Sequence, residues 1–194
     1  MIYSLPKTVL IDNQEYRIRY DFRVILTILE MLNDADLSDA DKAAGLLEMF
    51  YVNPEGIKDF KLAVDECYKF IDMGEMKPQK KSPRVMDWEQ DFNYIIAPIN
   101  RVMGQEIREI PYDYETSTGG LHWWTFMGAY MEIGSECLFS QLISIRDKRA
   151  RGKKLEKHER EWMHRNIEMV EFKRKFSDAE NDLAKEWMGG EKHG

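Results

Sequence analysis

The segment from Asp34 to Gly45, DADLSDADKAAG, alternates acidic residues as a calcium-binding loop does. A loop of the EF-hand type also needs a glycine at its sixth position for a sharp turn and a glutamate at its twelfth to close the site. Asp39 stands at the sixth position here and Gly45 at the twelfth. We therefore interpret these acids as helix-capping and solvated residues, and we expect no metal site.

The four histidines do not form a ligand set. His158 and His164 are six residues apart, which puts them on different sides of a helix, unlike the i and i+4 pair of a zinc-binding helix. His122 has no cysteine or second histidine nearby, and His193 lies in a glycine-flanked tail. We therefore expect no metal site at the histidines.

Nucleophilic catalysis has no recognisable signature in this chain. The two cysteines, Cys67 and Cys137, lie in apolar sequence far from each other, which favours a reduced, cytosolic protein without a disulfide framework. No G-x-S-x-G, phosphate-binding loop or dinucleotide-binding glycine pattern is present. We expect no catalytic residue and no cofactor, and we predict that the chain is not an enzyme.

A basic run between residues 146 and 160 is the strongest local charge feature. Its bases are Arg146, Lys148, Arg149, Arg151, Lys153, Lys154, Lys157 and Arg160. The run could bind nucleic acid, but the chain as a whole carries a net charge of −7, which repels phosphate backbones. No aromatic residues are interleaved with the bases as they are in single-strand binders, and bases also stabilise helix C-termini. A nucleic-acid partner is therefore a minor alternative.

Two adjacent tryptophans, Trp123 and Trp124, point about 100° apart on a helix and cannot share one narrow stripe. Burial of both in the core and exposure of one to a partner both remain open. We predict that Trp124, in register with Met127 and Met131, is core and that Trp123 contacts another helix or subunit. The predicted partner contacts are Trp123, Phe126 and Tyr130, with Arg146, Arg149, Lys153 and Lys154 of the basic run.

The first element needed to position these residues is a β-hairpin. Residues 8–20 alternate apolar and polar side chains around a polar turn, which is the one convincing strand signal in the chain. Asp21 follows as the N-cap of a helix over residues 22–32. No run of about 18 apolar residues occurs, so we expect no membrane partner.

The sequence of the rest of the chain predicts helices. They cover residues from about 38 to 51, 57 to 71, 88 to 103 and 120 to 148, and Pro98 should kink or break the third of them. Residues 73–85 read as an exposed linker. The expected fold is mainly α: a helical bundle over residues 1–150 with a small N-terminal β-hairpin, followed by a charged helical arm and tail over residues 151–194.

Three stretches of the sequence resemble a known family. They are NQEYRIRYDFRVILTILEML, LHWWTFMGAYMEIG and LFSQLISIRDKRARGKKLEKHEREW. They resemble the bacteriophage gene-product-fifteen family of Gram-positive siphophages and prophages, whose members look like tail genes placed between the major tail protein and the tape measure. The most distinctive parts are Asp21-Phe22-Arg23, Trp-Trp-x-Phe and Ile-Arg-x-Lys.

The resemblance implies a tail assembly chaperone. Such a protein would bind the tape measure protein, help to recruit tail-tube subunits in the cytoplasm of the host bacterium, and be absent from the mature virion. The partners implied are the tape measure protein, the major tail protein and a companion chaperone from the upstream gene, and self-association is left open. The first alternative is a structural virion component such as a head-tail connector protein, and the second is the nucleic-acid binder described above.

Overall fold

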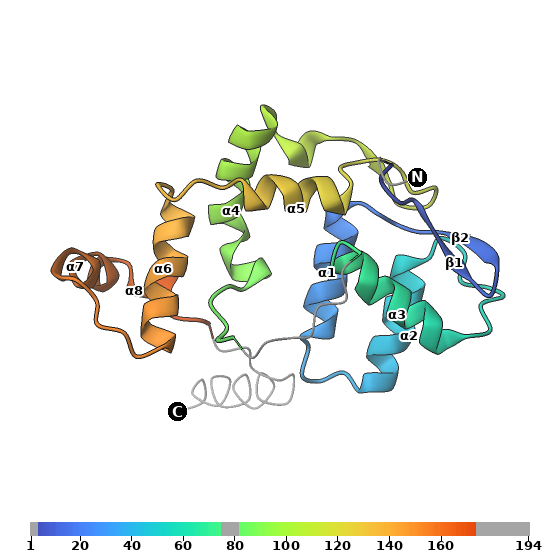
Figure 1. Ribbon diagram of the computed structural model, residues 1–194, viewed down its shortest axis with the longest axis horizontal. Coiled ribbons are helices and arrows are strands. Elements are labelled where there is room, and N and C mark those ends of the chain that lie inside the picture. The colour runs from blue at the N-terminus through green and yellow to red at the C-terminus, as the bar shows by residue number, and fades with distance from the viewer. Residues whose placement is uncertain (1–3, 75–81, 174–194) are drawn as a thin grey trace, which may run out of the picture.

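The computed structural model describes residues 4–74 and 82–173 (Figure 1). Within these residues the chain forms eight α-helices and a small N-terminal β-hairpin, which confirms the mainly α fold. Most of the expected linker at 73–85, His193 and the arm beyond residue 173 lie outside the described residues. Figure 1 shows α1 to α3 and the hairpin on one side, α6 to α8 on the other, and α4 and α5 between them.

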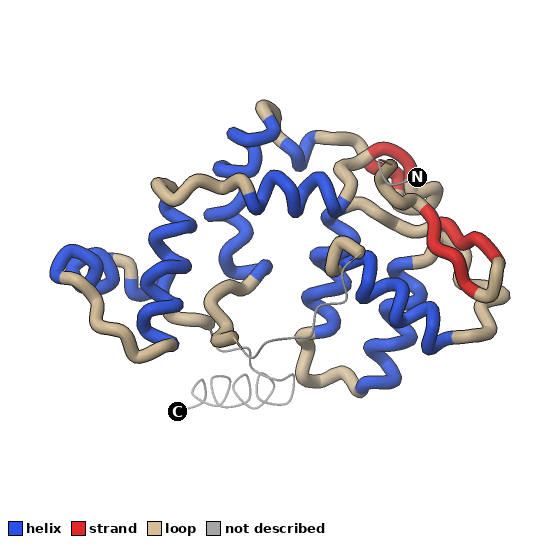
Figure 2. The backbone as a smooth tube through the Cα atoms, in the orientation of Figure 1, coloured by secondary structure: helices blue, strands red, loops and turns tan. Residues whose placement is uncertain are grey.

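The N-terminal hairpin has the predicted place and a tight turn. Strand β1 (Thr8–Ile11) pairs antiparallel with β2 (Gln14–Arg17). The two turn residues, Asp12 and Asn13, have φ values of 49° and 63°, which asparagine and aspartate tolerate better than most residues. Figure 2 shows the strands gathered at one end of a molecule that is otherwise helical.

The three following helices begin at capping residues. They are α1 (Phe22–Leu32), α2 (Asp39–Phe50) and α3 (Phe60–Ile71). Asp21, Ser38 and Asp59 each accept a hydrogen bond from a backbone N–H of the first turn. The third helix begins three residues later than predicted because Asp59, and not a residue before Ile57, caps it.

Helix α4 (Trp88–Met103) ends at Gly104, whose φ of 68° is the left-handed conformation expected at a helix stop. The helix continues through Pro98, so the break that we considered does not occur. Proline removes one backbone donor, but Ile95 and Ile99 on either side are fully buried, and their packing holds the helix together.

The segment after α4 holds a second, very short hairpin. A 3₁₀ turn, η1 (Ile107–Glu109), leads into β3 (Tyr112–Asp113), which pairs with β4 (Thr118–Gly119). The sequence here predicts only irregular chain. Strands of two residues are too short to produce an alternating pattern, so this pairing left no signal.

The single long helix predicted over residues 120–148 is wrong. The chain forms α5 (Trp123–Met131) and α6 (Leu138–Ala150), separated by a loop. Cys137 caps α6 by accepting a hydrogen bond from the Ser140 backbone N–H, and the Ser140 hydroxyl donates to the Gly134 carbonyl. The two shorter helices bury different faces, which explains why the combined sequence is apolar on nearly every side.

The last two helices are α7 (Lys157–Arg165) and α8 (Ile167–Val170); α8 packs against α6, and α7 packs against α8. Leu142 and Ile145 of α6 form a second core cluster with Leu155 and Val170. The main core is built from the hairpin and helices α1 to α6. The described part of the predicted arm, residues 151–173, is therefore held against α6 by apolar contacts, although its sequence is strongly charged.

Candidate interaction surface

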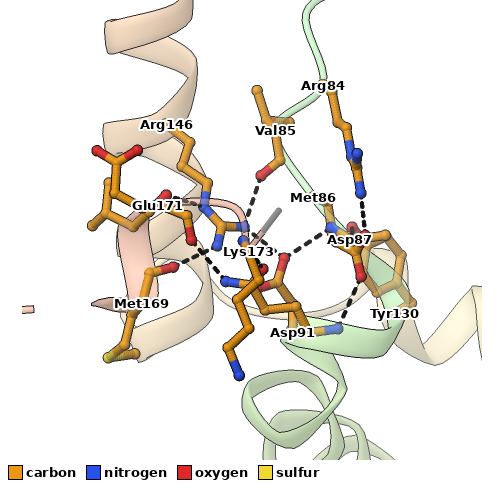
Figure 3. Close-up of polar contacts among 12 residues, drawn as sticks. Arg84, Val85, Met86, Asp87, Asp91, Tyr130, Arg146, Met169, Glu171 and Lys173 are labelled. Carbon is orange, nitrogen blue, oxygen red and sulfur yellow. Dashed lines mark hydrogen bonds and ion pairs between the residues drawn. The ribbon is translucent and has the colours of Figure 1, made fainter. Parts of the chain in front are cut away.

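Arg146 lies inside the molecule and not on its surface (Figure 3). Its guanidinium donates to Asp91 Oδ2 at 2.6 Å and to the backbone carbonyls of Val85, Met169 and Val170. We call these five residues the Arg146 clasp. It ties α6 to the start of α4 and to the end of α8, so Arg146 is corrected from a partner contact to a structural residue.

The Asp91 carboxylate of the clasp is completely buried, and only one of its two oxygens, Oδ2, accepts hydrogen bonds. Asp91 Oδ2 also accepts the backbone N–H of Asp87 at 2.9 Å, whereas Oδ1 has no hydrogen-bond partner among the described residues. The aromatic ring of Phe172 covers Arg146, with the guanidinium carbon 4.2 Å from the ring centroid. Removal of either partner of such a buried pair leaves the other charge buried and unpaired, which strongly destabilises the fold.

The rest of the basic run is largely neutralised by neighbouring acids. Lys148 pairs with Glu159 at 2.5 Å and Arg149 pairs with Glu171 at 2.7 Å. The hydrogen bond from Lys148 lowers the pKa of Glu159. Within the described ranges, Lys153 and Lys154 are exposed and take part in no ion pair. The run is therefore not a continuous positive surface, because the fold brings acids from α7 and from the segment after α8 onto it.

The two tryptophans cap the C-terminus of α3. The indole N–H of Trp123 donates to the Ile71 carbonyl at 2.9 Å, and that of Trp124 donates to the Phe70 carbonyl at 2.8 Å. The last carbonyls of a helix have no partner within the helix, so these two bonds satisfy acceptors that would otherwise be orphaned. No pattern in the sequence indicates this role.

We predicted Trp124 as core and Trp123 as a contact with another helix or subunit, and the structure buries Trp123 more deeply than Trp124. Trp123 is 1% exposed, whereas Trp124 is half-buried. Trp88 of α4 packs against the Trp123 ring, and Phe126, which we also predicted as a partner contact, is fully buried against Phe22 of α1. Trp123 does contact other helices as predicted, but it and Phe126 cannot contact a partner in this structure.

Tyr130, the third aromatic of the predicted contact face, is also turned toward its own chain. It is half-buried, and its hydroxyl donates to Met86 Sδ at 3.2 Å. Burial raises the pKa of the Tyr130 phenol. The aromatic face of α5 is therefore an internal surface that α1 and α4 cover.

Asp21 fixes the first helix to the segment before α5. Its buried carboxylate accepts hydrogen bonds from the Arg23 side chain at 2.7 Å and from the Leu121 backbone N–H at 2.8 Å. The Asp21 hydrogen bond raises the pKa of the Arg23 guanidinium. A Cβ atom on Gly120 would lie 2.2 Å from Asp21 Oδ2, so only glycine fits there. This joint explains physically why Asp21 and Arg23 occur together.

His122 completes the same joint and caps α5. Its Nδ1 accepts the backbone N–H of Trp124 at 3.0 Å, and its Nε2 lies 2.8 Å from the Pro6 carbonyl. Nε2 therefore carries the proton. Burial lowers the pKa of the His122 imidazole, so the neutral form that caps the helix is favoured. Its ring is used in packing and capping.

An open groove lies between α1 and the first turns of α4, with a volume of about 350 Å³. Its apolar walls are Phe22, Leu26, Leu29, Trp88 and Phe92. Its polar rim is Arg23, Thr27, Glu30, Asn33, Asp87 and Glu89. We call this surface the α1–α4 groove. The sequence does not reveal it, because apolar residues at helical spacing read as core until the packing shows which of them remain uncovered.

Two properties of the described residues bear on other classes of function. No group of three or more histidine, cysteine, aspartate or glutamate side chains within residues 4–74 and 82–173 is arranged to hold a metal ion. None of the helices in this part of the chain is long and apolar enough to cross a membrane.

Comparison with known proteins identifies the family. The family described as Bacteriophage Gp15 protein matches residues 1–172, which is most of the chain and includes every element described above. The searches of curated proteins and of solved structures gave no match. The chain therefore belongs to the bacteriophage Gp15 family.

Proposed function

We propose that this phage protein is a tail assembly chaperone that binds the tape measure protein and helps to recruit tail-tube subunits. Membership of a phage family supports the setting. The tail role rests on the resemblance of the sequence to tail genes that lie between the major tail protein and the tape measure. In this proposal the chain acts without catalysis in the host bacterial cytoplasm, and the major tail protein and a companion chaperone are its further partners.

The observation that carries the proposal is the α1–α4 groove. In the role that the resemblance implies, the chain would cover a long tape measure helix, and the apolar face of an amphipathic helix repeats every three or four residues. Two helix walls lined by Leu26, Leu29 and Phe92, with a polar rim, are a surface suited to an amphipathic helix. The closed aromatic face of α5 offers no comparable surface.

Co-expression with the cognate tape measure tests the proposal. We expect the tape measure to become soluble and to copurify with the chain. Leu26→Glu places a charge on the apolar wall and should lower the copurified amount at least about tenfold. Phe60→Glu is the matched control, because Phe60 is 61% exposed on α3, away from the groove.

Two results would contradict the proposal. One is a tape measure that is equally insoluble with and without the chain. The other is the chain itself in purified virions, detected by mass spectrometry at a fixed number of copies, since a chaperone leaves before the particle is complete. The second result would point instead to a structural virion component.

A further inference from the structure

The outer edge of strand β1 is unpaired in the N-terminal hairpin. The Ile18 backbone N–H donates to the Lys7 carbonyl at 3.1 Å, so the odd-numbered residues of this segment direct their backbone groups toward β2. Thr8 and Leu10 therefore direct their backbone groups to the other side, where none of the described residues hydrogen-bonds to them. Unpaired backbone groups are rarely buried, and Leu10 is 59% exposed. This edge is a template for a further strand.

The charges at the two ends of β1 favour a second copy of the same strand. Lys7 precedes the strand and Asp12 follows it, and both are exposed. Antiparallel pairing of two copies places the Lys7 end of each beside the Asp12 end of the other. Parallel pairing would bring like charges together. The antiparallel arrangement also has a two-fold axis, so the same edge serves both copies.

We propose that the chain forms a symmetric dimer in which β1 pairs antiparallel with β1 of a second copy. In the register that uses the unpaired groups of both strands, Thr8 of each copy lies opposite Leu10 of the other. Residues that face each other in this way exchange two backbone hydrogen bonds. The two hairpins thereby become one four-stranded sheet, which is more stable than an isolated two-stranded hairpin. The exposed Leu10 side chain gains a cross-strand neighbour.

The pairing leaves the α1–α4 groove open, because no residue of the hairpin lines that groove. The contact is short, and interfaces of small area bind weakly. We therefore expect a monomer–dimer equilibrium with a dissociation constant on the order of 10–100 μM. The dimer does not depend on a client, so it is tested with the chain alone.

Sedimentation equilibrium of the full-length chain, from about 1 μM to about 1 mM, measures the dissociation constant. Leu10→Pro removes the outward N–H and leaves the ladder between β1 and β2 intact, so the dissociation constant should rise at least about tenfold. Glu15→Pro is the matched control. Glu15 lies opposite Leu10 on β2, and its N–H points away from β1 and has no acceptor among the described residues. This variant should change the dissociation constant less than about twofold.

Hydrogen exchange followed by NMR locates the contact. The amides of Thr8 and Leu10 should exchange at least about fourfold more slowly at about 1 mM than at about 10 μM, because a larger fraction of the chain is then dimeric. The Glu15 amide, on the other edge of the same hairpin, should exchange equally fast at both concentrations. Protection of all three amides would indicate unspecific aggregation and would overturn the inference.

Three further results would also overturn it: a chain that stays monomeric up to about 1 mM, an equal effect of the two proline substitutions, or slow exchange of Thr8 and Leu10 in the monomer, which would mean that the chain itself covers this edge. If Leu10→Pro fails to fold, as circular dichroism would reveal, the exchange comparison in the parent chain still decides. No tape measure is present in these experiments. A negative result therefore rejects the dimer and leaves the chaperone proposal to its own copurification test.

Discussion

At the scale of single residues, the Arg146 and Asp91 pair is the most sensitive point of the molecule. Arg146→Ala removes the cation from a pair whose side chains are 3% and 0% exposed, and it also leaves three backbone carbonyls without their donor. We expect a loss of about 3–5 kcal/mol in the free energy of unfolding, because the carboxylate is left buried and unpaired. Urea denaturation followed by circular dichroism measures it.

The neighbouring Arg149 provides the control for this substitution. Its ion pair with Glu171 is largely exposed, so Arg149→Ala should change stability by less than about 1 kcal/mol. Equal effects of the two substitutions would mean that the buried clasp contributes no more than an exposed pair, contrary to our assignment.

His122 makes stability depend on pH. Its pKa in the folded chain is lowered below the ordinary value of about 6.5, so the unfolded chain binds the proton first. The stabilisation from the neutral ring is complete above about pH 6.5 and is lost as the pH falls toward the folded pKa. His122→Asn keeps a capping acceptor without a titrating group. Thermal unfolding between pH 5 and 7.5, at steps of about half a unit, should therefore show a smaller pH dependence in this variant.

The exposed His164 provides the control substitution for this measurement. His164→Asn should retain the pH dependence of the parent chain, since that side chain lies in solvent on α7. If the unfolding temperature depends on pH equally in both variants, the capping contact of His122 does not control the loss of stability at acidic pH.

At the scale of elements, the tryptophan pair stabilises the end of α3. Trp124→Phe keeps an aromatic ring but removes the N–H that donates to the Phe70 carbonyl. We expect a loss of about 1 kcal/mol and faster hydrogen exchange in the last turn of α3. Trp162→Phe, in the second core on α7, should leave exchange in α3 unchanged. Unaltered exchange in Trp124→Phe would show that the indole bonds do not hold this helix end.

The joint between α1 and α5 requires a glycine. Gly120 has a φ of 72°, and its missing Cβ makes room for the Asp21 carboxylate. Gly120→Ala should therefore lower stability by at least about 2 kcal/mol, from backbone strain and from displacement of Asp21. Gly134→Ala is the control, since no heavy atom lies within 4 Å of its added Cβ. If Gly120→Ala and Gly134→Ala unfold at the same temperature, the close approach of Gly120 to the Asp21 carboxylate is contradicted.

At the scale of the whole molecule, α6 belongs to both cores. Phe139 near its start is in the main core, and Leu142 and Ile145 are in the second. We therefore expect residues 151–173 to unfold together with the rest of the described chain, although the sequence suggests a boundary at residue 150. Hydrogen exchange along a urea series measures this, and earlier exchange of α7 and α8 alone would support the boundary instead.

Local signals in the sequence were sufficient to predict the N-terminal hairpin and most of the helices. The hairpin, the cap at Asp21 and the helix over residues 88–103 were predicted because turns, caps and apolar periodicity act between residues close in the chain. The break between α5 and α6 was missed, since it depends on Cys137 and Ser140 bonding to one another and to Gly134, which no periodicity encodes.

What the sequence by itself determined is the mainly α fold, the positions of most helices and the family of the chain. Only the tertiary structure decided which side chains are available to a partner. Arg146, Trp123 and Phe126 have the residue types of contact residues, yet Asp91, Ile71 and Phe22 bury them. Leu26 and Leu29 have the pattern of core residues, yet they line an open groove. Exposure depends on which elements pack together over long separations, and local sequence patterns carry no record of that packing.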